Sequence, residues 1–75
     1  MEWTEFDARP LLAGGTDPYD RIMEAWQALP SGRGLAVLAP FEPRPLMMAF
    51  SGMGVRVAVR QEGEKLHRLL AGPKP

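Results

Sequence analysis

Cysteine is absent from this sequence of 75 residues. The chain therefore has no disulfide framework, no thiolate metal ligands and no cysteine nucleophile. Histidine occurs once, at position 67, whereas a protein metal site needs three or four ligands. We therefore expect no metal and no cofactor. The weaker alternative is a copper(I) or haem site formed by His67 and a methionine, but methionines at helical spacing more often fill a core.

An excess of one charge is also lacking. Nine Lys and Arg residues balance nine Asp and Glu residues, so the formal net charge is zero. No summed field attracts DNA, RNA or an anionic membrane surface, and we expect neither nucleic acid nor membrane as a partner. No apolar run approaches the roughly 20 residues that span a bilayer, and residues 1–7 lack the basic and apolar regions of a signal peptide. These absences favour a soluble cytoplasmic protein.

The length predicts a single domain over residues 1–75. A chain of this size buries only about 60% of its unfolded surface and supports one core. Hydrophobic residues make up 45% of the chain and charged residues 24%, which is typical of a globular protein rather than a disordered one. Residues 71–75 contain two prolines and are expected to form a loose tail.

The first half of the chain predicts a strand, a loop and a helix. Residues 3–8 alternate, which predicts a strand with Phe6 facing inward, and residues 11–16 are expected to form a loop. Asp17 and Pro18 are typical of a helix start, because the carboxylate accepts first-turn N–H groups and proline fits the first turn. Apolar residues at spacings of three and four then predict a helix over residues 18–29.

The second half predicts a strand, a helix and a hairpin. Residues 35–39 form an apolar run without alternation, which suits a strand in the middle of a sheet. The prolines before Leu46 are tolerated in a first helical turn, and the apolar stripe that follows predicts a helix ending near Gly52. Residues 55–60 alternate as a half-buried strand. Glu62-Gly63 is the expected tip of a hairpin, and residues 65–70 return as the last strand.

This order of elements predicts the fold class. Two right-handed strand-helix-strand connections place both helices on one face of the sheet. We therefore expect a two-layer α/β (α+β) sandwich with the order β-α-β-α-β-β, in which a four-stranded mixed sheet has one uncovered face.

Two segments carry a resemblance to a known family. Residues 6–11, Phe-Asp-Ala-Arg-Pro-Leu, with the later helix start at Asp17-Pro18, are similar to the beginning of the TusA/SirA-like sulfur-carrier superfamily. In those carriers a Cys-Pro pair opens the first helix, and the cysteine carries a persulfide to a partner. Asp17 stands at the position of that cysteine, so the resemblance implies the fold without the sulfur-carrier activity.

The second segment narrows the resemblance. Residues 40–46, Pro-Phe-Glu-Pro-Arg-Pro-Leu, resemble the start of the second helix in a cysteine-lacking branch of short bacterial domains of unknown function. Members of that branch occur alone, duplicated or beside hemerythrin-like domains, which implies a link to redox or nitrogen-oxide physiology. The resemblance covers nearly the whole chain and implies no particular reaction.

The first candidate site is the rim formed by the loops over residues 9–17 and 40–45. Two helix amino termini would point toward this rim, at the carboxyl ends of two strands. Two arginines could hold an anion there, whereas nearby carboxylates would repel it. Capping of the helix is the other interpretation of the aspartate. The rim residues are Arg9, Asp17, Glu42 and Arg44.

The second candidate is the uncovered face of the sheet. Tryptophan and arginine are frequent anchors of protein interfaces, and the predicted strands place both types on this face. The alternative is that Trp3 and Leu69 cover each other within the monomer, and a weak homodimer could form through this face or an edge strand. The residues expected on this face are Trp3, Arg56, Ala58, Arg60, His67 and Leu69, of which Trp3, Arg56, Arg60 and His67 are the candidate interface.

No pattern in the sequence marks an enzyme. Ser31 and Ser51 lack the signature of a nucleophile, and Gly14-Gly15 matches neither phosphate-binding glycine motif. We therefore expect a non-enzymatic accessory module that binds an unidentified protein partner. The alternative is a domain that binds a small ligand or an anion at the rim.

Overall fold

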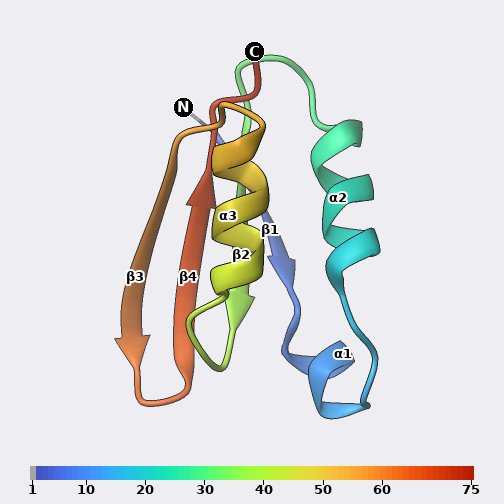
Figure 1. The fold of residues 1–75 in the computed structure, drawn as a ribbon, viewed down its shortest axis with the longest axis vertical. Coiled ribbons are helices and arrows are strands. Elements are labelled where there is room, and N and C mark those ends of the chain that lie inside the picture. The colour runs from blue at the N-terminus through green and yellow to red at the C-terminus, as the bar shows by residue number, and fades with distance from the viewer. Residues whose placement is uncertain (1) are drawn as a thin grey trace.

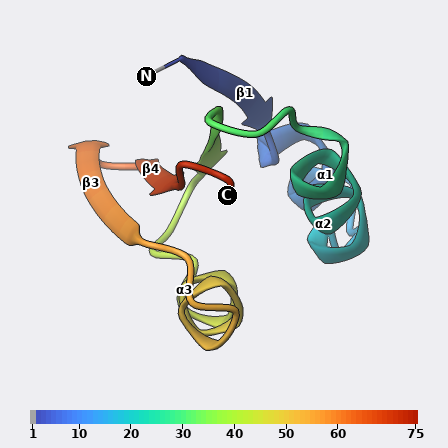
Figure 2. The same cartoon turned by 90° about the horizontal axis from the view of Figure 1, so that it is seen from above.

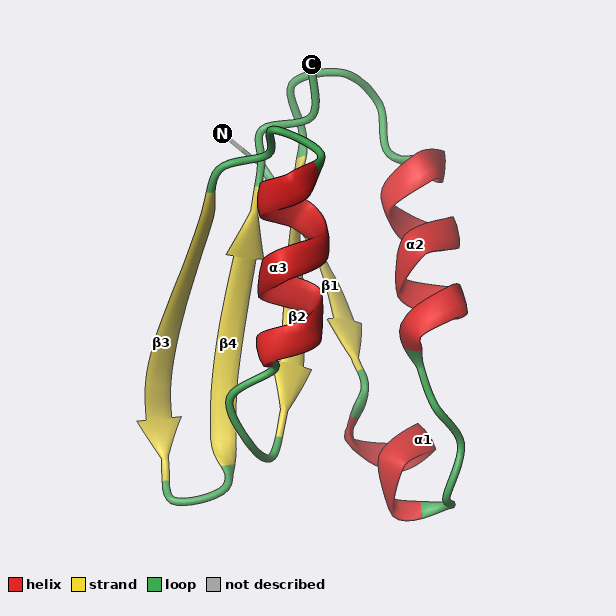
Figure 3. Ribbon diagram, in the orientation of Figure 1, coloured by secondary structure: helices red, strands yellow, loops and turns green. Residues whose placement is uncertain are grey.

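The helices of this protein lie against one face of a four-stranded mixed sheet (Figures 1 and 3). The structure is a computed structural model, and it describes residues 2–75. The predicted α+β fold class is confirmed. The strands are β1 (Trp3–Asp7), β2 (Gly34–Ala39), β3 (Val57–Gly63) and β4 (Leu66–Ala71), and the helices are α1 (Arg9–Ala13), α2 (Tyr19–Ala28) and α3 (Arg44–Gly52).

The strands follow the spatial order β1-β2-β4-β3. β1 and β2 are parallel, with Phe6 opposite Val37, and the segment that contains α1 and α2 connects them. β4 is antiparallel to both β2 and β3. Seen from above, α2 and α3 lie on the same side of the curved sheet (Figure 2), which leaves the other face without a helix.

The core lies between the sheet and the two long helices. Trp26 of α2 contacts Phe50 of α3 edge to face, with ring centroids 5.2 Å apart and an interplanar angle of 69°. Such a pair contributes about 0.5–1.5 kcal/mol beyond the area that it buries, so it fixes the two helices relative to each other. The largest fully buried side chains are Phe50, Ile22, Leu35, Leu69 and Val37.

Strand β2 is buried on both faces, which confirms the prediction from its unbroken apolar run. All six of its residues are buried. Leu35 and Val37 belong to the core beneath the helices. Leu38 points to the face without helices and is nevertheless only 5% exposed, so side chains from the neighbouring strands cover it.

A short helix replaces the loop predicted over residues 11–16. Pro10 lies in the first turn of α1, where its missing N–H costs no hydrogen bond within the helix. The N–H of Leu12 donates to the carbonyl of Ala8 at 3.1 Å, and the N–H of Gly14 donates to the carbonyl of Pro10 at 3.1 Å. The proline that ends β1 therefore also starts a helix.

Helix α2 begins at Tyr19, one residue later than predicted. Pro18 is the residue before the helix, and its carbonyl accepts the N–H of Ile22 at 2.9 Å. Asp17 still satisfies a first-turn donor, because its Oδ1 accepts the N–H of Tyr19 at 3.0 Å. The expected hydrogen-bonding role of Asp17 is thus found one position further from the helix.

The chain after β4 is not a loose tail, which corrects the expectation for residues 71–75. Lys74 exchanges backbone hydrogen bonds with the turn before β2, since its N–H donates to the carbonyl of Arg33 at 2.9 Å and its carbonyl accepts the N–H of Gly32 at 2.7 Å. Its Nζ donates to the carbonyls of Gln27 at 2.6 Å and Leu29 at 2.9 Å. Lys74 therefore caps the carboxyl end of α2.

The predicted facing of the last strand is wrong. In the β3–β4 register, Val59 lies opposite Leu69 and Gln61 lies opposite His67. Leu69 and His67 therefore face the helices rather than the face of the sheet without helices. Leu69 is fully buried in the core, and Nδ1 of His67 is buried without a hydrogen-bond partner within residues 2–75. Because Leu69 and Leu70 are both apolar, the pattern of this strand did not determine which one faces inward.

Candidate functional site

A groove of about 190 Å³ opens at the carboxyl ends of β1 and β2. Its walls come from the start of α2 on one side and from the β2–α3 loop and the start of α3 on the other. The side chains that form it are almost all apolar, and Asp17 is the one charged residue in the lining. The lining includes Val37 and Ala39 of β2, Tyr19 and Ile22 of α2, and Phe41 and Leu46 on the α3 side.

Prolines fix the α3 side of this groove. Pro43 immediately precedes α3 and is buried, and its carbonyl accepts the N–H of Met47 at 3.0 Å. Pro45 lies in the first turn, where a proline is tolerated. With the backbone held in this way, Phe41 stays at the edge of the groove and remains 51% exposed.

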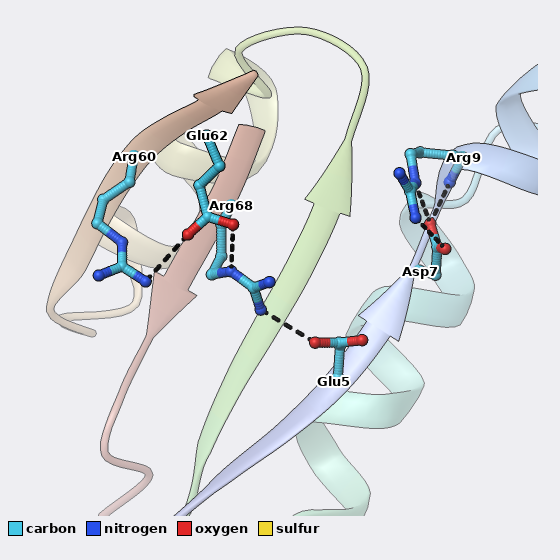
Figure 4. A network of polar contacts seen from close by, with 6 residues as sticks. All are labelled: Glu5, Asp7, Arg9, Arg60, Glu62 and Arg68. Carbon is cyan, nitrogen blue, oxygen red and sulfur yellow. Dashed lines mark hydrogen bonds and ion pairs between the residues drawn. The ribbon is translucent and has the colours of Figure 1, made fainter. Parts of the chain in front are cut away.

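Each predicted rim arginine is already paired with an acidic residue two positions away. Arg9 donates Nε to Oδ1 of Asp7 at 2.9 Å and a terminal nitrogen to Oδ2 at 2.8 Å (Figure 4). The hydrogen bonds from Arg9 hold the pKa of Asp7 below its ordinary value of 3.8. Arg44 pairs with Glu42 at 3.1 Å. Each arginine therefore has an acidic partner close to it at the surface.

The structure places the four predicted rim residues in unequal positions. Asp17 lines the groove, whereas Arg9, Glu42 and Arg44 are exposed and do not line it. Asp17 makes no ion pair within residues 2–75. Sequence reasoning missed the apolar lining, although an exposed phenylalanine between two prolines, Phe41, was a usable signal.

The face of the sheet without helices carries a chain of ion pairs. Arg68 of β4 donates to Glu62 of β3 at 3.0 Å and reaches across β2 to Glu5 of β1 at 3.0 Å (Figure 4). Arg60 of β3 extends the chain, since it pairs with Glu62 at 3.1 Å. The hydrogen bond to Glu5, followed by that to Glu62, raises the pKa of Arg68. The register partner of Arg68 on β2 is Leu38.

The structure does not bring the four predicted interface residues together on this face. Trp3 and Arg60 lie on it, Arg56 is exposed just before β3, and His67 is on the opposite side of the sheet. Trp3 is 37% exposed, and its ring occupies the space above Gly34, where an added Cβ would clash with Cζ3. This face therefore carries charged side chains and Trp3 together with the apolar residues Leu70 and Ala58.

These features define a small two-layer α+β domain with an apolar groove at one end. Residues 2–75 contain no group of three side chains that could hold a metal ion and no helix long and apolar enough to cross a membrane. The chain belongs to the family described as an uncharacterized conserved protein (DUF2249), whose family model matches residues 5–72. No curated protein and no solved structure matched the chain.

Proposed function

We propose that this protein is a non-enzymatic interaction module that holds an apolar side chain of a partner protein in the groove beside α2 and α3. One observation carries the proposal: the groove has an apolar floor of buried side chains, among them Ile22 and Val37, and exposed aromatic side chains at its edges. Phe41 and Tyr19 are 51% and 39% exposed at its edges. Apolar surface that a monomer leaves exposed in a concave site is typical of a binding site.

The size of the groove limits what it can hold. A dry cavity of about 150 Å³ in another protein accommodates a benzene molecule. A groove of about 190 Å³ therefore has room for one phenyl ring or one leucine side chain. A single side chain of a partner protein fits this limit.

The anion-binding alternative has less support from the geometry. Its two counter-charges, Arg9 and Arg44, are each engaged by an acidic neighbour and lie outside the apolar lining. The interaction role agrees with the TusA/SirA-like resemblance, since those carriers deliver sulfur to a partner from the start of the corresponding helix. The cytoplasmic location predicted from the sequence belongs to the same proposal.

The test is affinity capture from the native host with a matched pair of variants. Phe41→Ala removes the exposed aromatic at the groove, and Met48→Ala removes an apolar side chain that is 75% exposed elsewhere on α3. Both variants should fold, because neither side chain is buried. We expect a stoichiometric partner that the wild type and Met48→Ala retain and that Phe41→Ala loses. If the wild type and both variants retained the partner, the contact would lie outside the groove. If no partner were recovered, the proposed interaction role would be refuted.

A further inference from the structure

We propose that the partner segment bound in the groove carries a lysine or arginine next to its apolar side chain. The inference rests on the proposed function, because it names the chemistry of the occupant of the same groove.

The charges around the groove leave a negative excess. The pairs Asp7–Arg9 and Glu42–Arg44 cancel internally. At the start of α2, the charge of Asp20 is balanced by that of Arg21, the next residue. Asp17 in the lining makes no ion pair within the part of the chain that the structure describes, so it is the charge that stays uncompensated. A cationic partner group gains from this field, whereas an anionic group is repelled.

Asp17 is placed to meet such a cation at the mouth of the groove. Its Oδ1 accepts the N–H of Tyr19, and its second oxygen has no hydrogen-bond partner among residues 2–75. Because the side chain is exposed and lines the groove, an ammonium or guanidinium beside the bound apolar group can reach it. An exposed contact of this kind adds selectivity more than affinity.

The aromatic edge of the groove favours the same partner. Tyr19 and Phe41 both line the groove and are both partly exposed. Aromatic faces attract cations through the ring quadrupole, and the aliphatic stem of lysine or arginine packs well on apolar surface. These two residues therefore suit a cation with an apolar stem better than a carboxylate.

The helix ends do not reverse this preference. A helix amino terminus attracts anions through unsatisfied N–H groups. Here the N–H of Tyr19 already bonds to Asp17, and the N–H of Arg44 bonds to the carbonyl of Glu42 at 3.0 Å. Pro43 and Pro45 have no N–H at all. Fewer backbone N–H groups are thus free to bind an anion at this rim.

The experiment compares three dipeptide probes that differ only in charge. N-acetyl-Phe-Lys-amide, N-acetyl-Phe-Gln-amide and N-acetyl-Phe-Glu-amide are titrated into the wild-type chain, and backbone amide shifts are followed by NMR. We expect saturable shifts at groove residues and binding in the order Lys, Gln, Glu, with each step about two- to fivefold, the range of an exposed charge contact. The preference should weaken as salt is raised.

A matched pair of variants assigns the preference to Asp17. Asp17→Asn keeps an oxygen that can accept the N–H of Tyr19, so the helix start is preserved. Glu24→Gln makes the same charge change at an exposed α2 residue that does not line the groove. We expect Asp17→Asn to abolish the Lys-over-Gln preference and Glu24→Gln to retain it.

The outcomes separate the two proposals. Equal binding of the three probes by the wild type would overturn the cationic partner and leave the apolar groove as the binding site. Preference for the Glu probe would overturn it in favour of an anionic partner. Absence of any shift at groove residues would remove both proposals.

Discussion

Removing the ammonium group of Lys74 tests whether the residues after β4 are part of the fold. Nζ of Lys74 donates to two carbonyls at the end of α2, those of Gln27 at 2.6 Å and Leu29 at 2.9 Å. These carbonyls belong to the helix terminus, where backbone acceptors lack partners and the helix dipole is negative. Lys74→Met keeps an unbranched apolar chain of similar length and removes the charge and both hydrogen bonds.

The expected loss of stability follows from those two contacts. A cation at an exposed helix carboxyl terminus stabilises a helix by about 0.3–1 kcal/mol. A net hydrogen bond from a charged group contributes about 1.5–3 kcal/mol when it is protected, and less when water competes, as it does at this half-buried side chain. We therefore expect Lys74→Met to lower the free energy of unfolding by about 1–2 kcal/mol. In a domain of this size, that loss lowers Tm by about 4–15 °C.

Thermal and urea unfolding followed by circular dichroism measure this loss. Lys65→Met, in the exposed β3–β4 turn, is the control for loss of a lysine and should change stability by less than about 0.5 kcal/mol. A chain shortened to end at Gly72 also loses the backbone bonds to Gly32 and Arg33, so it should be less stable than Lys74→Met. Wild-type stability in both the point variant and the shortened chain would refute the capping role.

Three further predictions concern the sheet. Gly34→Ala forces its new methyl group into the ring of Trp3, so it should cost about 1–3 kcal/mol in urea unfolding, and adding Trp3→Ala should recover part of that loss. Hydrogen bonds from Arg9 lower the pKa of Asp7 in the folded state, so the stability that they add is complete above pH 3.8 and is lost as pH falls through the lower folded pKa. In acid unfolding, the difference in stability between wild type and Asp7→Asn should therefore shrink as pH falls below 3.8. Arg68→Met should lower Tm by a few degrees in dilute buffer and by less in about 1 M NaCl, and an equal loss at both salt concentrations would contradict an ionic contribution.

Much of the fold could be predicted because several segments carry strong periodic signals. The structure has the burial patterns that three segments predicted. These are the apolar spacing of α2, the alternation around Val57 and Val59, and the unbroken apolar run of β2. Local signals were weaker where one residue could serve two elements. Pro10 ends β1 and also starts α1, and the hairpin turn lies at Glu64-Lys65 rather than at Glu62-Gly63. Such choices depend on contacts with the rest of the chain.

The site was harder to predict because it depends on register and on long-range pairing. The sequence placed Asp17 and the proline-rich loop at one end of the sheet, and residues of both line the groove. The proximity of Asp7 to Arg9 already predicted their ion pair, which the structure has. The sequence did not show that Arg44 would pair with Glu42, or that Phe41 and Tyr19 would line one groove. The reach of Arg68 to Glu5, 63 positions earlier in the chain, is likewise invisible without the strand order.

The position of β4 has a consequence for how the chain is made. This strand lies between β2 and β3, although it follows both of them in the chain. The segments that form β2 and β3 therefore emerge from the ribosome before β4, the strand that joins them, and β3 has no neighbour in the sheet until residues 66–71 emerge. The nascent chain exposes unpaired strand edges up to that moment, which is the form most open to aggregation or chaperone binding. Completion of the sheet is thus coupled to the end of synthesis of this domain.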